Sequence, residues 1–263
     1  MRLGRALACA ASLFVASCGA PLMKLPAGPG TPVADGSALL EQATAACRRV
    51  STLSAEVGVS GSVGGRRVRG RLLIGLAEPA SLYVEAPAPF GAPAFIIGAS
   101  NGDATLLLPR DRRVLEHGKP EELLDAIAGV PLDPAALKST LTGCDRDTGA
   151  PADVRAFGDG WRIVGGDRLR YLRRERPSAP WQLVSVVIGG HGGWRADYLD
   201  FVDGLPRLVR LVSSEARRFD LRLALSQVDL NLELEPSTFR VSVPPGTALI
   251  SLDELRATGP LSR

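Results

Sequence analysis

The sequence is poor in the residues on which enzymes, metalloproteins and nucleic-acid-binding proteins depend. Its 263 residues include only two histidines, His117 and His191, and four cysteines, so no cluster of metal ligands is predicted. Aromatic residues make up 5% of the chain, and basic and acidic residues nearly balance at a net charge of +3. This balance gives no reason to expect nucleic acid as a partner. Beyond residue 17, no charge-free apolar run is long enough to cross a bilayer as a helix.

Glycine and proline, in contrast, are abundant, with 29 and 20 residues. These turn-forming residues argue against a helical bundle. The hydrophobic share of 45% is typical of a globular chain and excludes a wholly disordered protein.

The first 17 residues have the pattern of a signal peptide. Arg2 and Arg5 precede an apolar stretch that is too short to span a membrane. The stretch ends in Val-Ala-Ser-Cys at Cys18, which resembles the lipobox of bacterial lipoproteins. In that motif the cysteine is diacylated, becomes the N-terminus after cleavage and is acylated again. A secretory signal that happens to end near a cysteine is the alternative interpretation.

Residues 18–36 are rich in proline, glycine and alanine, which predicts a flexible tether behind a lipidated Cys18. Several acyl chains give stable anchoring, so we expect attachment to a membrane. Gly19 follows the cysteine where an aspartate would signal retention, and by resemblance to the sorting rule of enteric bacteria this favours the outer membrane. Residues 37–263 show no internal repeat and no break in composition, so we predict one domain there.

Two cysteines remain besides Cys9, which lies in the signal, and Cys18. An even pair in an oxidising compartment favours a disulfide between Cys47 and Cys144. Two buried free thiols are the alternative.

Most of the domain follows the two-residue period of β-strands. The pair Gly64-Gly65 between two such segments predicts a tight hairpin. Near Gln227 the alternation shifts phase, which predicts a β-bulge that bends the strand. The expected strands are residues 57–63, 68–74, 81–85, 94–99, 104–108, 112–116, 161–164, 168–174, 182–188, 194–202, 207–213 and 217–228.

Short helices are predicted where apolar residues recur with helical spacing between recognisable start and stop residues. N-caps and prolines mark the starts, and glycines mark the ends. The expected helices are residues 38–50, a helix from Pro120 to Gly129, a helix from Asp133-Pro134 to Gly143, and a short last helix with a capping box at Ser251 and Glu254.

These elements predict a mainly β protein of the α+β class. A single sheet of about eleven strands has no second sheet to pack against, so it must close or half-close around an interior of its own. We therefore expect a single half-open antiparallel β-barrel with short lid helices over an apolar cavity. Two stacked sheets in a sandwich fit the same alternation and remain the alternative.

The glycine cluster around His191, residues 189–193, is the most conspicuous candidate for catalysis. Phosphate loops need a strand-to-helix junction, whereas strand-like sequence lies on both sides of this cluster, so we expect a hairpin tip. A hydrolase with His191 as general base would need a nucleophile and an orienting acid, and neither is nearby in sequence. Asp197, Asp200 and Asp203 have the spacing of solvated positions. We expect no enzyme, no catalytic residue and no cofactor.

Two segments carry a resemblance to a known family. Residues 86–108 read APAPFGAPAFIIGASNGDATLLL, in which a proline–apolar–glycine loop precedes a strand hairpin. The helical insert, residues 121–143, reads EELLDAIAGVPLDPAALKSTLTG and contains a Gly-x-Pro step and a final glycine. Both are similar to the LolB family, outer-membrane lipoproteins that receive lipoproteins from the periplasmic carrier LolA. The later segments GLPRLVRLVS and LEPSTFRVSVPPG look like the wider LolA/LolB superfamily, so the resemblance spans residues 38–246.

The resemblance implies a half-open barrel whose helices cover an apolar cavity for the acyl chains of a client lipoprotein. Each methylene group removed from water is worth about 0.8 kcal/mol, so such a cavity needs a continuous apolar lining. An ordinary filled core is the alternative, because alternation does not distinguish filled from hollow. The candidate lining is Leu72, Ile74, Phe95, Ile97, Leu106, Leu108, Val186, Ile188, Phe219, Leu221, Leu223 and Leu225, with lid residues Leu123, Leu124, Ile127, Leu137 and Leu141.

Phe90 is the sharpest single candidate. It lies between Pro89 and Gly91 in a stiff, proline-flanked loop. In the LolB family an exposed leucine at this place engages the membrane and helps to release the client. The resemblance implies that Phe90 inserts into the membrane; a phenylalanine folded back over the barrel mouth is the alternative.

The resemblance thus predicts a monomeric lipoprotein on the periplasmic side of the outer membrane. It would accept acylated lipoproteins from a LolA-like periplasmic carrier and insert them into the membrane. A LolB-like anchored module that binds another lipid or an envelope protein partner is one alternative, and a periplasmic hydrolase that uses His191 is another.

Overall fold

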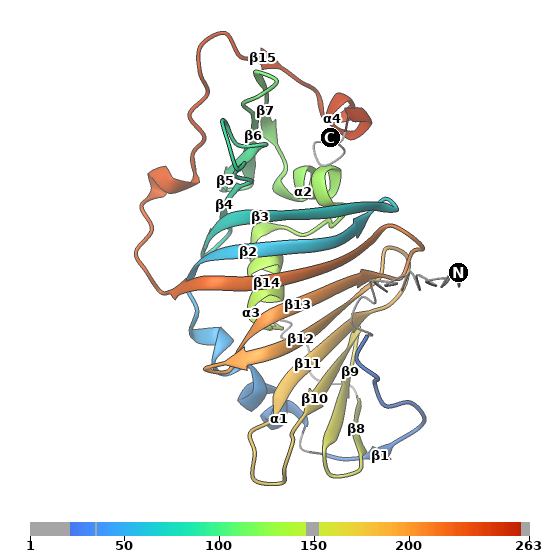
Figure 1. Ribbon diagram of the computed structural model, residues 1–263. Coiled ribbons are helices and arrows are strands. Elements are labelled where there is room, and N and C mark those ends of the chain that lie inside the picture. Colours follow the sequence, from blue (N-terminus) through green and yellow to red (C-terminus); the bar gives the residue numbers. More distant parts are fainter. Residues whose placement is uncertain (1–21, 35, 146–152, 259–263) are drawn as a thin grey trace, which may run out of the picture.

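A single open sheet forms the body of the protein (Figure 1). The computed structural model describes residues 22–34, 36–145 and 153–258. Within them, fifteen strands follow one another in the order β1-β8-β9-β10-β11-β12-β13-β14-β2-β3-β4-β5-β6-β7-β15. Every neighbouring pair is antiparallel except β7 and β15. Because β1 and β15 stand at opposite ends of this order, the sheet is not a closed barrel, and one sheet in the described residues excludes the sandwich.

The helices and strands have the following bounds. The strands are β1 (Thr31–Pro32), β2 (Thr52–Val63), β3 (Arg66–Ala77), β4 (Ser81–Glu85), β5 (Ile96–Ser100), β6 (Asp103–Leu108), β7 (Arg113–Gly118), β8 (Asp153–Phe157), β9 (Trp161–Gly165), β10 (Arg168–Arg173), β11 (Gln182–Ile188), β12 (Trp194–Val202), β13 (Leu205–Ser213), β14 (Phe219–Leu230) and β15 (Ala248–Leu249). The helices are α1 (Gly36–Thr44), η1 (Cys47–Arg49), α2 (Pro120–Ala128), α3 (Pro134–Thr142), η2 (Pro236–Phe239) and α4 (Leu252–Thr258).

The mainly β class with few helices is as expected, but the described sheet is larger than the predicted eleven or so strands. The alternation in the sequence misses β1, β8 and β15. Two of these strands are only two residues long, which is too short for a two-residue period to show.

The sheet consists of two antiparallel meanders joined by one pair of distant strands. Strands β2 to β7 follow in chain order, and so do β8 to β14, while β14 pairs with β2. In this pair Leu225 lies opposite Val57, and Phe219 lies opposite Val63. The bulge predicted near Gln227 is confirmed, because the register shifts between Ser226 and Asp229 and the φ of Gln227 is 48°.

Helices α2 and α3 cover one face of the sheet, which we term the inner face; the opposite side is the outer face. Figure 1 shows α3 crossing behind β2, β14 and β13. The predicted ends of both helices are confirmed: the Asp133 side chain accepts a hydrogen bond from the Ala136 N–H at 2.8 Å, and Gly129 and Gly143 adopt left-handed conformations. The capping box before α4 also forms, whereas α1 ends at Thr44, earlier than predicted.

Two links hold α3 to the sheet. A disulfide joins Cys47 of η1 to Cys144 beyond α3, with a Cα–Cα distance of 5.4 Å. The buried ammonium of Lys138 donates to the Val50 carbonyl at 2.7 Å and pairs with the Glu78 carboxylate at 2.8 Å. Because the ammonium is compensated by these groups, its burial anchors the helix rather than destabilising it.

The segment before α1 lies along the body. The Met23 N–H donates to Asp197 at 3.3 Å, Arg195 donates to the Met23 carbonyl, and Thr31–Pro32 pairs with β8. The stretch that the sequence predicts as a flexible tether therefore contacts the sheet from Met23 onward. The signal peptide, Cys18 and the first residues of the tether lie outside the described residues. Among the described helices, none has the length and apolarity needed to cross a membrane.

Candidate functional site

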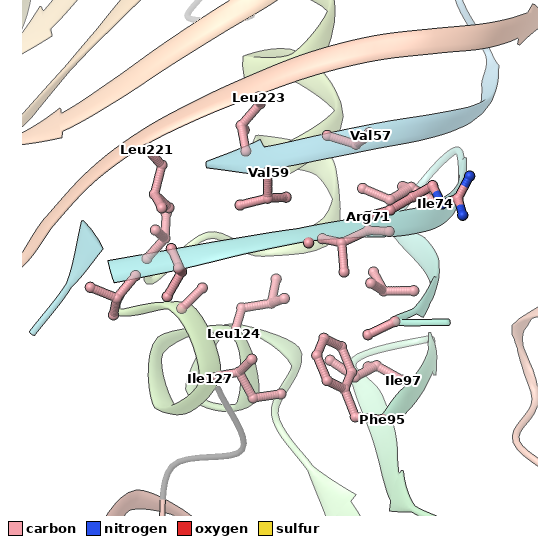
Figure 2. Close-up of a pocket in the computed structure, with 18 of the residues that line it drawn as sticks. Val57, Val59, Arg71, Ile74, Phe95, Ile97, Leu124, Ile127, Leu221 and Leu223 are labelled. Carbon is pink, nitrogen blue, oxygen red and sulfur yellow. The ribbon is translucent and has the colours of Figure 1, made fainter. Parts of the chain in front are cut away.

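An apolar cavity of about 370 Å³ lies between the inner face and the helices α2 and α3 (Figure 2). Figure 2 shows Leu124 and Ile127 of α2 directed toward the sheet, with Phe95 at the flank. The volume is within the range of about 300–1,000 Å³ typical of small-molecule pockets. The wall consists of Val57, Val59, Val63, Arg67, Val68, Arg69, Gly70, Arg71, Leu72, Ile74, Val84, Ala86, Pro87, Ala94, Phe95, Ile97, Leu124, Ile127, Ala128, Val130, Leu132, Leu137, Leu141, Leu211, Leu221 and Leu223.

The alternation of the β2–β3 hairpin builds the main wall of the cavity. Register places Val57 opposite Leu72 and Val59 opposite Gly70, so all four positions are on the inner face. Figure 2 shows the guanidinium of Arg71 at the border, away from the apolar side chains. Apart from its three arginines, the wall is apolar and consists of aliphatic side chains, glycine, proline and the ring of Phe95.

Gly70 contributes open space at the edge of the cavity. A Cβ built at this position would have no heavy atom within 4 Å, although Val68 and Leu72 on the same face carry side chains. Gly70 is exposed, so this space adjoins the opening of the cavity. The cavity of about 370 Å³ favours a hollow interior over a completely filled core.

The cavity reaches the surface beside an unpaired strand edge. β4 pairs only with Leu73–Ala77 of β3, so in the described residues Arg66–Leu72 has no neighbour on that side. Gly70 on this stretch is exposed and lines the cavity. Ala86 and Pro87, in the loop after β4, line the cavity as well. This edge, α2 and the loop after β4 form the mouth.

Phe90 projects from the loop between β4 and β5. The base of the loop is closed by a hydrogen bond from the Ala86 N–H to the Phe95 carbonyl at 3.0 Å. Arg110 braces it by donating to the Ala92 carbonyl at 3.0 Å. Phe90 is 91% exposed, so it is not folded back over the mouth. Whether it enters a membrane stays a prediction.

Ten of the residues named from the sequence lie on the cavity wall: Leu72, Ile74, Phe95, Ile97, Leu221, Leu223, Leu124, Ile127, Leu137 and Leu141. The others do not line it. Six of them are buried in the core: Leu106, Leu108, Val186, Phe219, Leu225 and Leu123; Ile188 is half-buried against that core. The two-residue alternation shows which face of the sheet a residue lies on, but not which part of the sheet it belongs to. The cavity reaches only the central strands and the β4–β5 region.

Sequence reasoning missed part of the wall, including Val57, Val59 and Val63 of β2. Their alternation is visible in the sequence, and the Gly64-Gly65 turn fixes the register that sets them opposite β3. The missing signal was Gly70 itself, because a glycine inside a strand marks a place where the side-chain layer is interrupted.

The glycine cluster forms the loop between β11 and β12, as expected. His191 is 98% exposed in its side chain, and its Nδ1 lies 3.3 Å from Glu215. Asp197 departs from expectation, because it is buried and accepts hydrogen bonds from Arg195 and Ser185, each at 2.7 Å. These partners give it a structural role. No group of three metal-ligating side chains occurs in the part of the chain that the structure describes.

Burial raises the pKa of three tyrosines, Tyr83, Tyr171 and Tyr198. At Tyr83 and Tyr198 a nearby carboxylate adds to the shift. Burial, together with a 2.6 Å hydrogen bond to Glu85, raises the pKa of Tyr83 to about 12. Burial raises the pKa of Tyr198 well above its usual value, and Asp145 adds to this shift. All three hydroxyls stay protonated at neutral pH, and none of them lies on the cavity wall.

Comparisons with known proteins address the fold. No family model matches the chain, and no curated protein matches its sequence. Among solved structures, a LolA superfamily protein from Nitrosomonas europaea is similar with a TM-score of 0.55 and 12% identity, over 78% of this chain and 97% of that one. A DUF1329 family protein from Desulfovibrio piger gives a TM-score of 0.48 and 11% identity, over 80% of this chain and 98% of that one. The first of these similarities confirms the expected LolA-like fold, and at 12% identity it shows the fold alone.

Proposed function

We propose that the protein binds acyl chains of a lipid or lipoprotein in the apolar cavity. The observation that carries this proposal is the hollow apolar interior, which opens beside the unpaired edge of β3. Burial of each methylene group would contribute about 0.8 kcal/mol without any hydrogen bond, so shape would set the specificity. The LolA-type fold supports a carrier or receptor in the cell envelope.

The finer proposal is a receptor anchored to the outer membrane through Cys18. A monomer would take acylated lipoproteins from a LolA-like carrier and insert them into the membrane, with no chemical step. The exposed Phe90 supports this role, because its loop also contributes Ala86 and Pro87 to the cavity wall.

A second candidate is an anchored module that binds a smaller lipid. The cavity volume favours it, since about 370 Å³ is near the lower end of the usual range for ligand pockets. A client with several acyl chains would need α2 to move outward.

Mass spectrometry of the purified chain from residue 18 onward, with Cys18→Ser to prevent acylation, tests acyl binding. We expect acyl lipid to co-purify and to be released when the protein is unfolded. If no acyl lipid is found, and a fluorescent fatty acid does not bind to the delipidated protein, the proposed function is wrong.

Depletion of the protein in its host separates the two candidates. A receptor requires acylated lipoproteins to accumulate on their carrier or at the inner membrane. An unchanged distribution of lipoproteins would favour the module that binds another lipid.

A further inference from the structure

Arginine side chains form a row across the outer face of the central strands. Arg210 of β13 lies opposite Arg222 of β14. Arg222 lies opposite Ser60 of β2, and Ser60 in turn lies opposite Arg69 of β3. Arg67 and Arg71 flank Arg69 on the same strand face, and these five arginines are termed the arginine row.

Alternation directs the row away from the cavity. Leu221 and Leu223 line the cavity, so Arg222 between them points to the outer face. Leu72 likewise points inward next to Arg71. Arg67, Arg69 and Arg71 border the cavity at the free edge of β3, whereas Arg210 and Arg222 do not line it. The part of the outer face that carries Arg210 and Arg222 is therefore separate from the site of the acyl-binding proposal.

Only part of this charge is compensated within the protein. Arg71 pairs with Glu56 at 3.3 Å, and Arg210 pairs with Asp220 at 2.9 Å. Like charges directly opposite one another on a sheet, as in the Arg210–Arg222 pair, are destabilising unless an anion lies between or above them. Three of these arginines are exposed, and their side chains form no hydrogen bond or ion pair with another described residue: Arg67, Arg69 and Arg222.

The N-terminal segment reaches the same face beside the row. Asp197 of β12 lies opposite Arg210 of β13, and the Met23 N–H is bonded to Asp197. Met23 is only five positions after Cys18 in the chain. Fully extended, these five steps span at most about 18 Å. An acyl chain on Cys18 would therefore enter the membrane close to the row.

We infer that the arginine row is a contact surface for anionic lipid headgroups of the membrane that holds the anchor. The planar guanidinium donates paired hydrogen bonds to phosphate oxygens, and an acyl anchor combined with a basic patch binds a membrane stably. This inference rests on the membrane anchoring in the proposed function but not on the cavity. It fixes the outer face toward the lipid surface.

The test uses the chain from residue 18 onward with Cys18→Ser, so that acylation cannot cause binding. This chain keeps every described element. Sedimentation is measured with vesicles of phosphatidylcholine alone and of phosphatidylcholine with phosphatidylglycerol. The protein should sediment with the anionic vesicles only, and added salt should weaken the binding.

Charge reversal assigns the binding to the row. The variant Arg222→Glu changes an arginine of the row that does not line the cavity, and it should weaken binding to the anionic vesicles by about fivefold or more. The matched control, Arg240→Glu, makes the same charge change at an exposed arginine outside the row and should bind like the parent. Equal thermal unfolding of both variants confirms that they are folded.

Equal losses in the two variants would overturn the inference, because net charge alone would then explain binding. Absence of binding to anionic vesicles would overturn it as well, and would be the result if the row binds an acidic protein instead. Co-purified acyl lipid in the Arg222 variant separates the two proposals, because Arg222 does not line the cavity. If that lipid is absent from parent and variant while vesicle binding persists, only the acyl-binding proposal fails.

Discussion

At the residue scale, the absence of a side chain at Gly70 leaves open space at the edge of the cavity. Replacing Gly70 with phenylalanine should fill part of the cavity and lower acyl-lipid binding about tenfold or more, since several methylene groups lose their place. The backbone at this position is not left-handed and lies in a strand, so the variant should fold. Titration with a fluorescent fatty acid measures the effect.

Gly189→Phe serves as the matched control, because a Cβ there also has open space around it and the residue lies in a loop away from the cavity. The control should bind like the parent. Undiminished binding by the Gly70 variant would show that the ligand lies elsewhere.

Phe90 makes a second residue-scale prediction. Phe90→Glu removes the only large apolar group at the tip of a braced loop, and its 91% exposure means that folding and cavity binding should be unaffected. Delivery of a bound lipoprotein to liposomes should be lost, whereas Phe90→Leu should retain it. If Phe90→Glu delivers as well as the parent, the membrane-inserting role is wrong.

Short-range features of single residues could be predicted from the sequence, whereas the cavity wall could only be predicted in part. The N-cap at Asp133 and the glycine ends of α2 and α3 depend on neighbours within a few residues. Leu106 and Val186 show the limit, because both alternate like wall residues but lie on strands away from the cavity. Asp197 is a further case, since its buried environment depends on Arg195 and on Met23 from a distant segment.

At the element scale, the two lid helices differ in how they are held. α3 is fixed by the disulfide and by Lys138, whereas α2 is tied to the β13–β14 loop by the ion pair of Arg218 and Asp125 at 3.0 Å. A partly exposed ion pair is worth at most about 1 kcal/mol. We therefore expect α2, rather than α3, to move when a ligand enters the cavity.

Asp125→Asn should weaken this tie and raise the exchange rate of a bound acyl ligand by about twofold to fivefold. Glu121→Gln, the same charge change on the same helix, should leave the rate unchanged. Stopped-flow displacement of a fluorescent fatty acid measures both. Identical rates in all three proteins would mean that α2 does not control access.

At the scale of the whole molecule, the sequence predicts the mainly β class, but neither the number of strands nor their order. Hairpins such as β2–β3 follow from local turns, because Gly64-Gly65 leaves no other short connection. The pairing of β14 with β2 has no local signal, since Leu225 and Val57 are far apart in the chain. Long-range pairings of this kind depend on the total burial of the sheet, which no short window of sequence contains.

The pairing of β14 with β2 also determines when the sheet can be completed during synthesis, because β2 is made long before β14. The free backbone edge of β2 leaves the ribosome early, yet its partner strand ends only at Leu230 of a 263-residue chain. Until then, the early half of the chain carries an unpaired strand edge that is prone to misassembly. We therefore expect the nascent chain to depend on a holding chaperone until its last long strand has been made.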